Sequence, residues 1–326
     1  MIISSIYSKH KYHHNKLIYY FKNALRCIEP KFLLKRKFNQ IMRLKSDFDE
    51  TYLYERVNYY NKISQNNLKD PVMKVADFKY IVSKTKRKYA SSYFFDSFEY
   101  IRLFPGDMKF VFEFGDIRWN FETPSITKSR PVEKGNENNV LLKLDKSRHF
   151  IFVKDKTDFA KKKNQLIGRS AIWQNNRKIF MRKYFKSPIC NLGAVNKNCE
   201  NPKWFVKPIG IDEHLKYKFI LSLEGNDVAT NLKWIMSSNS IAVMPKPTVE
   251  TWFMEGKLVG GIHYIEIKDD YSDLEEKLNY YIANEKEARS IIENANKWVS
   301  QFQNNQREDL LSVLVLEKYL RETRQI

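Results

Sequence analysis

Residues 216–283 have the sequence KYKFILSLEGNDVATNLKWIMSSNSIAVMPKPTVETWFMEGKLVGGIHYIEIKDDYSDLEEKLNYYIA. Within it, residues 218–223 are an apolar run with the length and character of an internal parallel strand. Polar residues 224–227 interrupt the run, and residues 228–237 carry apolar side chains at helical spacing. The order predicts a strand, a tight turn and a helix.

The alternation continues through the second half of this stretch. Further strands are predicted at 241–244 and 264–267, and a helix with a capping-box pattern is predicted to open at Ser272, with Glu275 as its acidic member. Ligands bind at the carboxyl ends of parallel strands, where helix N-termini offer N–H groups to anions. The pattern therefore predicts where a site lies, without yet predicting its function.

Working outward, an apolar run at 109–114 predicts a strand that ends at Gly115 and Asp116, and residues 122–139 have the composition of a loop. A second loop is expected at 188–208. Short strands are expected at 140–144 and 150–153, and helices at 16–27, 47–64, 85–103, 177–186, 285–303 and 306–322. This alternation predicts an α/β protein of two doubly wound domains, residues 1–163 and 164–326.

Composition limits the class of protein. The chain has 326 residues, of which 43% are hydrophobic and 14% aromatic, enough to build packed cores. It has no apolar run long enough to span a bilayer, and its N-terminus lacks the apolar core of a secretory signal. Three cysteines, Cys27, Cys190 and Cys199, argue against a disulfide framework. We expect a cytoplasmic protein, soluble or peripheral to a membrane.

The net charge of +19 is concentrated near the N-terminus. Residues 1–46 hold eleven Lys and Arg against one acidic residue, Glu29, and residues 16–27 predict a basic amphipathic helix. Such a charge attracts nucleic acid, an anionic membrane surface or a phosphorylated glycolipid. The alternatives are a solvated lysine-rich surface and a helix packed on the first domain.

The stretch 216–283 resembles the CAP10-like glycosyltransferases of family 90, and most closely their bacterial lipopolysaccharide branch. The matching features are the KYK-initiated strand that ends in a glycine turn, Ser240 before the next strand, Glu250 followed by aromatic residues, and the triplet that starts at His263. Weaker matches extend the resemblance to roughly residues 100–300. It implies a GT-B fold, two Rossmann-like domains with an interdomain cleft, and transfer by a single inverting displacement.

The resemblance implies that Asp116 is the catalytic base. Residues 105–116 resemble the family stretch that leads from Pro-Asp-Met into a strand ending at the catalytic aspartate, but Gly106 is inserted. Ile117 and Arg118 replace the Tyr-Pro that follows in the family. A turn-capping aspartate is the structural alternative, and Glu113 is a weaker candidate for the base.

Arg169 and Arg177 are the candidates for binding the donor diphosphate. They resemble an Arg-Gly-Ser segment of the family in which a second arginine follows at the same separation, with Ser170 in place of the glycine. A guanidinium donates two hydrogen bonds to one phosphate, which suits this role. The alternative is a pair of surface arginines in a basic chain.

The turn after the first strand supplies further donor-binding candidates, which are Glu224, Gly225, Asn226, Asp227, Thr230 and Lys233. Its backbone N–H groups could face phosphate, although one glycine is a weak signal. The two carboxylates would repel phosphate, so sugar hydroxyls, Thr230 or the helix terminus are their expected partners. Asn231 replaces an arginine of eukaryotic relatives, and Lys233 could compensate.

Glu250 matches an acidic residue of the family ahead of an aromatic pair, and a carboxylate can accept hydrogen bonds from both ribose hydroxyls. The alternative is a helix N-terminal glutamate. Ser240 also matches, as a donor-binding candidate, and so does His263; a structural role is an equal alternative for both.

No metal or other cofactor is expected. His10, His13 and His14 have helical spacing but no supporting carboxylate or cysteine nearby, and the cysteines lack a CxxC arrangement. No Asp-x-Asp motif falls at a predicted strand end. This pattern agrees with a mechanism that uses protein cations in place of a metal ion.

Together these features predict transfer of a hexose, glucose or galactose, from a UDP-sugar to a hydroxyl of the lipopolysaccharide or lipooligosaccharide core. The enzyme would be cytoplasmic and peripheral on the anionic inner face of the bacterial inner membrane. The alternatives are a basic nucleic-acid-binding protein and a degenerate transferase that acts as a binding module. No RNA- or DNA-binding motif is evident in this sequence. Ser170 and Asn231 motivate the degenerate transferase.

Overall fold

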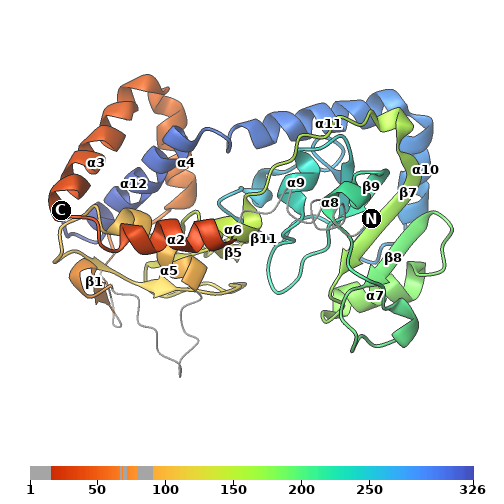
Figure 1. The fold of residues 1–326 in the computed structure, drawn as a ribbon, viewed down its shortest axis with the longest axis horizontal. Coiled ribbons are helices and arrows are strands. Elements are labelled where there is room, and N and C mark those ends of the chain that lie inside the picture. The colour runs from red at the N-terminus through yellow and green to blue at the C-terminus, as the bar shows by residue number, and fades with distance from the viewer. Residues whose placement is uncertain (1–15, 67, 69–71, 79–90) are drawn as a thin grey trace. The chain divides into compact units, whose positions relative to one another are not determined.

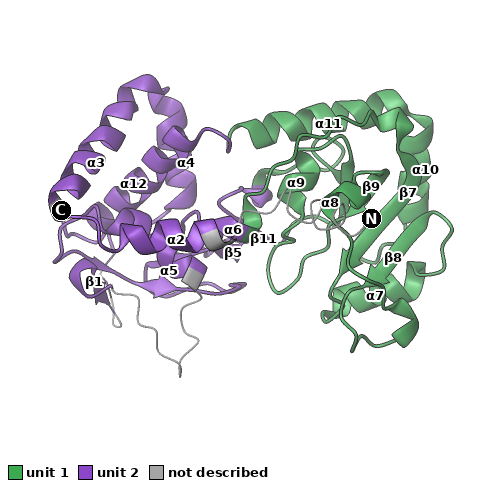
Figure 2. Cartoon of the chain, in the orientation of Figure 1, with its two compact units in different colours: residues 1–14, 148–247, 257–301 green, residues 15–147, 248–256, 302–326 purple. Residues whose placement is uncertain are grey.

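A computed structural model of the chain describes residues 16–66, 68, 72–78 and 91–326. These residues form two compact units (Figure 2). Among them, unit 1 comprises residues 148–247 and 257–301, and unit 2 comprises residues up to 147 together with 248–256 and 302–326. The three histidines considered as metal ligands lie outside the described residues.

Unit 1 is built on a five-stranded sheet (Figure 1). The strands follow the spatial order β12 (Ile265–Glu266), β10 (Ile241–Met244), β9 (Tyr217–Leu221), β7 (Lys163–Ser170) and β8 (Cys190–Ala194). All neighbouring pairs are parallel. The predicted internal parallel strand is confirmed, because β9 lies between β10 and β7. Numbered along the chain, the order is 2-1-3-4-5, which is a doubly wound topology.

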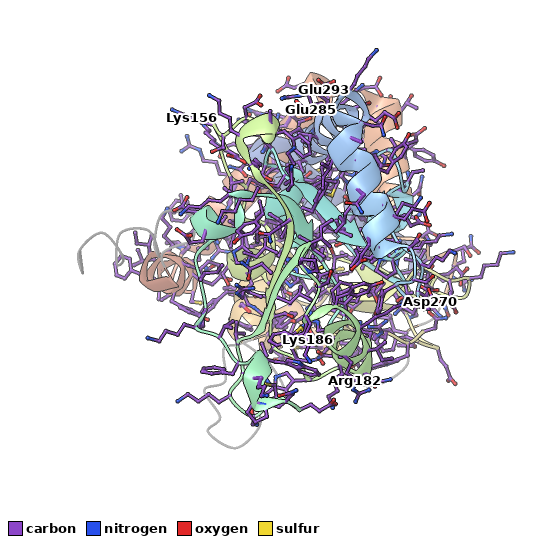
Figure 3. The ribbon with its side chains drawn as sticks, turned by 90° about the vertical axis from the view of Figure 1, so that its right-hand side faces the viewer. Lys156, Arg182, Lys186, Asp270, Glu285 and Glu293 are labelled. Atoms are coloured by element: carbon purple, nitrogen blue, oxygen red, sulfur yellow. The ribbon has the colours of Figure 1, made fainter. Side chains whose placement is uncertain are left out.

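Three helices cover one face of this sheet, α7 (Asn175–Tyr184), α10 (Leu274–Ala283) and α11 (Glu285–Ser300). They bury their apolar stripes against Leu166, Phe219 and Val243. Each large apolar side chain removed from water contributes about 1.5–3 kcal/mol. Charged side chains point outward from this unit, as Figure 3 shows for Lys156, Arg182, Lys186, Asp270, Glu285 and Glu293.

Several local predictions in unit 1 need correction. The helix expected from residue 228 is only α9 (Leu232–Met236), and residues 150–153 are not a strand. The capping box at Ser272 is absent: Asp273 is the N-cap, and its carboxylate accepts from the backbone N–H of Lys268. The predicted loop 188–208 contains β8, whose short edge position gives a weak pattern in sequence.

Unit 2 has a three-stranded parallel sheet of β3 (Phe112–Glu113), β4 (Ser125–Thr127) and β6 (Asn139–Leu141). The unit also has two separate antiparallel strand pairs, β1 (Met73–Lys74) with β2 (Lys109–Phe110), and β5 (Ser129–Pro131) with β11 (Val249–Thr251). Its main helices are α2 (Lys16–Arg26), α3 (Lys31–Arg43), α4 (Glu50–Tyr60), α5 (Ser91–Ile101) and α12 (Asn305–Glu322), and the short α6 (Lys146–His149) spans its boundary. The strand predicted at 109–114 is thus divided between two sheets.

A buried carboxylate explains why unit 2 is assembled from separate parts of the chain. Glu308 of α12 accepts hydrogen bonds from Arg56 of α4 (3.2 Å), Lys143 (3.2 Å) and the indole of Trp252 (2.7 Å). Tyr60 stacks on Trp252 with ring centroids 3.7 Å apart. Losing one partner would leave a buried charge uncompensated. These contacts hold segment 248–256 and α12 with the N-terminal residues.

The observed units differ from the two continuous domains expected from sequence. The chain changes unit at residues 147/148 and not 163/164, and it returns to unit 2 for 248–256 and again for its last helix. The coarser prediction is confirmed, since the fold is mixed α/β with parallel sheets. Among the described residues, no helix has the length and apolar character needed to cross a bilayer.

Candidate active site

A cavity of about 190 Å³ lies at the carboxyl ends of β7 and β9 in unit 1. The chain leaves β7 for β8 on one side of the sheet, whereas it leaves β9 for β10 on the other. Adjacent parallel strands whose connections diverge form the topological switch point at which doubly wound sheets bind ligands. Five of the residues that line this cavity are Arg169, Ser170, Arg177, Thr230 and Asn231.

Arg177, in the first turn of α7, joins the two strand ends. Its Nη1 donates to the carbonyl of Ala171 (3.0 Å), just after β7. Its Nη2 and Nε donate to the carbonyls of Leu223 (2.9 Å) and Glu224 (3.1 Å), just after β9. Burial lowers the pKa of this guanidinium from its ordinary value, because removal from water destabilises the charged form.

Arg169, near the end of β7, is held from the neighbouring strand. Its Nη1 and Nη2 donate to the backbone carbonyl (2.7 Å) and side-chain oxygen (2.6 Å) of Asn191 in β8. Its buried Nε has no hydrogen-bond partner among the described residues. Burial lowers the pKa of the guanidinium, an effect that Tyr217 partly opposes.

The two arginines share an unusual environment. Within the described part of the chain, the acceptors of both guanidiniums are carbonyl oxygens, and neither pairs with a carboxylate. No ion pair among the described residues therefore compensates these two charges. A bound anion would compensate the desolvation of both and form charge-assisted hydrogen bonds, so the cavity is suited to phosphate.

The turn after β9 packs directly on Arg177. A Cβ atom placed on Gly225 would lie 3.0 Å from the Nη2 of Arg177, so a larger residue would require this guanidinium to shift. The backbone N–H of Gly225 donates to the carbonyl of Asp227 (2.8 Å), and the Asn226 side chain accepts from Gln174 (2.8 Å). Because α9 starts only at Leu232 and has five residues, the expected helix N-terminus does not directly follow the turn.

Two predicted donor-binding residues lie elsewhere in unit 1. Ser240 precedes β10, and its hydroxyl donates to the carbonyl of Tyr217 (2.7 Å) and accepts from Lys162 (2.9 Å). This is the amino-terminal edge of the sheet, opposite the cavity. Lys233 is fully buried, with its Nζ 5.9 Å from the ring centroid of Phe150. Neither residue lines the cavity.

Asp116 follows β3 in unit 2. Gly115 before it has φ of +145°, a conformation that favours glycine. The Asp116 side chain is 34% exposed, and its Oδ1 accepts a hydrogen bond from the Nζ of Lys128 at 2.6 Å. The carboxylate thus reaches the surface at the end of a strand, as expected, while Glu113 lies within the strand itself.

Glu250 has an environment that differs from the expectation. It lies in β11 of unit 2, is buried, and accepts from the Nε of Arg130 at 2.8 Å and from the hydroxyl of Tyr59. The structural alternative expected Glu250 at a helix N-terminus, but it lies in a strand. Each carboxylate oxygen already has a protein donor, and the side chain is buried. The arrangement indicates that Glu250 stabilises unit 2.

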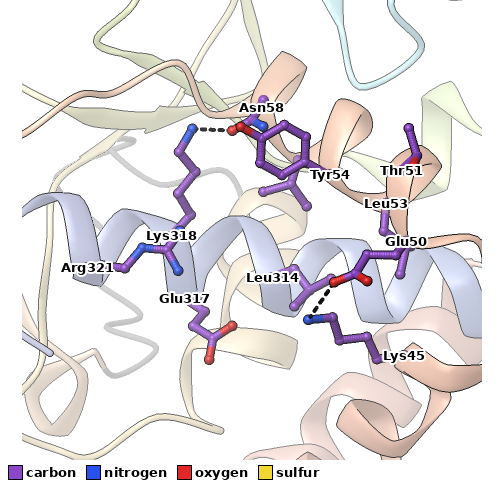
Figure 4. A pocket seen from close by; sticks show the side chains of 11 residues that line it. Lys45, Glu50, Thr51, Leu53, Tyr54, Asn58, Leu314, Glu317, Lys318 and Arg321 are labelled. Carbon is purple, nitrogen blue, oxygen red and sulfur yellow. Dashed lines mark hydrogen bonds and ion pairs between the residues drawn. The ribbon is translucent and has the colours of Figure 1, made fainter.

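A second cavity of about 500 Å³ lies in unit 2, between α4, α12 and the 3-10 turn Leu44–Asp47 (Figure 4). Lys318 donates to Asn58 on one side of it, and Lys45 lies 3.8 Å from Glu50 on the other. None of the residues predicted to act in catalysis or binding lines this cavity. Across the described ranges, no group of three or more His, Cys, Asp or Glu residues could hold a metal ion.

Comparison with known proteins identifies the class. The family model for glycosyl transferase family 90 matches residues 133–319, more than half of the chain. The chain therefore belongs to this family and is a glycosyltransferase. The match includes both arginines of the cavity, whereas Asp116 precedes it.

Two particular relatives are informative. The chain is 39% identical over 309 residues to the O-glucosyltransferase LpsA of Dichelobacter nodosus, which covers 94% of this chain and 95% of that protein. It is also 31% identical over 129 residues to the uncharacterized protein 179R of Invertebrate iridescent virus 6, covering 37% of this chain and 10% of that one. The first relationship makes this chain an LpsA-type member of the family.

Sequence analysis did not identify two residues that contact candidate site residues, Asn191 in unit 1 and Lys128 in unit 2. Asn191 lies in a segment expected to be a loop, and Lys128 lies in another. Each acts through a contact with a residue about 12 to 22 positions away. Neither contact has a local periodic signal, so only the tertiary structure reveals them.

We expect Arg177→Met to lower the free energy of unfolding by roughly 3 kcal/mol, because three carbonyl groups lose a charged donor. Chemical denaturation of the purified protein measures this. Arg182→Met on the same helix is the matched control, since Arg182 is exposed and pairs only at the surface with Glu200. Equal stability of the two variants would show that Arg177 does not hold the strand ends together.

We expect Glu250→Gln to lower the free energy of unfolding by about 3 kcal/mol, because it leaves the buried Arg130 without its counter-charge. UDP affinity of the variant, measured calorimetrically where it is folded, should be retained. Glu133→Gln, an exposed change nearby, should alter neither quantity. Retained stability with lost UDP affinity would instead restore the ribose-binding role.

Proposed function

We propose that this glycosyltransferase moves a hexose from a UDP-sugar to a hydroxyl group of the lipopolysaccharide or lipooligosaccharide core, with inversion at the transferred sugar. The observation that carries the proposal is the pair of partly buried guanidiniums, Arg169 and Arg177, which have no carboxylate partner among the described residues at the switch point of unit 1. The proposal includes the GT-B arrangement that the family resemblance implies.

The cavity would hold the diphosphate and not the whole donor. Its volume of about 190 Å³ is below the range of about 300–1,000 Å³ that is usual for complete ligand sites. Arg169 and Arg177 would bind the phosphate oxygens, and the hydroxyls of Ser170 and Thr230 at its wall would add hydrogen bonds. The carboxylates of Glu224 and Asp227 are better suited to sugar hydroxyls.

The proposed chemistry gives each of these groups a role. The acceptor hydroxyl attacks the anomeric carbon of the donor while Asp116 removes its proton, and the bond from that carbon to the diphosphate oxygen breaks. The electron pair of this bond leaves with UDP. Positive groups that meet this developing charge lower the barrier, and the arginines could supply what a metal ion supplies in other transferases. Attack from the face opposite UDP inverts the configuration.

The choice of glucose is supported by a relative. LpsA of Dichelobacter nodosus is called an O-glucosyltransferase, and the similarity extends over 94% of this chain. We therefore place UDP-glucose first among donors and UDP-galactose second. These sugars differ in one hydroxyl configuration, which one or two hydrogen bonds can discriminate.

We expect UDP-glucose to raise the melting temperature, with or without EDTA, and wild-type protein to release UDP when core lipooligosaccharide is added. Asp116→Asn should retain the thermal shift and lose turnover at least a thousandfold, because the amide cannot accept the proton. The matched control Asp107→Asn, in the loop before β2, should remain active. No response to UDP-glucose, UDP-galactose, UDP-xylose or their N-acetyl relatives would contradict the donor class, and an active Asp116→Asn would remove the base.

The proposal also includes contact with an anionic membrane surface. Within unit 2, one face of helix α2 packs against α5, where Tyr19 donates to Asp96 (2.7 Å). On and just after this helix, Phe21, Leu25 and Ile28 are 66%, 50% and 78% exposed. Apolar side chains among basic residues favour insertion at a headgroup boundary. The packed helix and the membrane helix, which sequence posed as alternatives, are thus compatible.

We expect wild-type protein to bind vesicles that contain phosphatidylglycerol, less strongly in high salt, and hardly to bind neutral phosphatidylcholine vesicles. The double variant Phe21→Ser with Leu25→Ser should bind at least tenfold more weakly in a co-sedimentation assay, because it loses exposed apolar area. Tyr54→Ser, which removes an exposed aromatic residue of α4, is the control. Equal binding by both variants would exclude this surface.

A further inference from the structure

Two consecutive residues hold the loop that carries Asp116. Lys128 and Ser129 lie where β4 ends and β5 begins. The hydroxyl of Ser129 accepts from the backbone N–H of Ile117 (3.0 Å) and donates to its carbonyl (3.1 Å). The ammonium of Lys128 donates to the Oδ1 of Asp116 (2.6 Å). Backbone and side chain of the loop are thus fixed from one point.

Lys128 is an unusual lysine. Only 2% of its side chain is exposed, whereas Asp116 is 34% exposed. Its Nζ also lies 5.7 Å from the ring centroid of Tyr93, whose ring stacks on Phe114 at 5.6 Å. A buried ammonium is costly unless a partner compensates it, and a lysine that served only the surface would leave its charge in water. Here the ammonium of the buried Lys128 donates to the carboxylate of Asp116, which reaches the surface.

We propose that Lys128 is a positioning residue for glycosyl transfer, which keeps the Asp116 carboxylate ionised and fixes its direction toward the acceptor hydroxyl. The inference rests on the proposed role of Asp116 as the base. Lys128 does not contact the substrate in this proposal. It acts through the carboxylate alone.

Two physical effects support this role. A positive charge within about 4 Å favours the ionised carboxylate, so Asp116 stays able to accept a proton at lower pH. A hydrogen bond to one carboxylate oxygen restricts rotation of the group, and small errors in the position of a base are costly in rate. Among the described residues, Tyr93 on α5 and Asp145 after β6 are titratable groups that interact with this cluster, and neither carries a positive charge.

The test is the pH dependence of UDP release from UDP-glucose, with core lipooligosaccharide as the acceptor. We expect Lys128→Met to lower kcat about ten- to a hundredfold and to move the acidic limb of the profile upward by about one pH unit. Its KM for UDP-glucose should not change, since the donor is bound by unit 1. Lys128→Arg, which keeps the charge, should retain the wild-type acidic limb.

Lys134→Met, which removes an exposed lysine of the same unit, is the control and should leave kcat and the acidic limb unchanged. If Lys128→Met does not fold, Lys128→Gln replaces it with the same expected shift. An unchanged kcat and pH profile in the folded variant would overturn the role of Lys128 while Asp116→Asn remains inactive. Full activity of Asp116→Asn would instead remove the base itself, and this inference with it.

Discussion

The guanidinium of Arg177 is the contact on which the architecture of the site depends. In a parallel sheet, strands whose connections diverge leave their last carbonyl groups without partners from the next element. Arg177 donates to three such carbonyls, one beyond β7 and two beyond β9. This one planar cation thereby links the chain beyond β7 to the chain beyond β9 and holds the turn that packs against it. The same side chain forms part of the wall of the cavity.

Buried charge is used differently in the two units. In unit 2, Glu308 and Glu250 are each surrounded by donors, and these networks hold together segments far apart in sequence. In unit 1, the partly buried Arg169 and Arg177 have only carbonyl acceptors among the described residues. Carbonyls satisfy the N–H groups without neutralising the charge. The first arrangement stabilises a fold, whereas the second leaves positive charge that an anionic ligand can compensate.

The sequence predicted the elements that are long or strongly apolar. The runs that became β9 and β10 were found within two residues, and so were helices α2 and α12, whereas α11 ends three residues before its predicted end. Strands β4, β5 and β11 have three residues each and were missed. Three residues cannot show a periodicity, and such strands form because a partner strand is already in place. Of the site, Arg169, Ser170, Arg177 and Thr230 came together at one cavity, whereas Ser240 and Glu250 did not.

The sequence by itself determined the parallel α/β character of the chain, its family and the residue types from which a phosphate site could be made. These depend on local runs of apolar side chains and on short motifs, which neighbouring residues define. Only the tertiary structure decided which charges are neutralised. Glu250 meets Arg130 across 120 positions, and Arg56 meets Glu308 across 252. Such distant partners decide whether a charged side chain stabilises the fold or is available to bind a ligand. They cannot be identified from the neighbouring residues in the sequence.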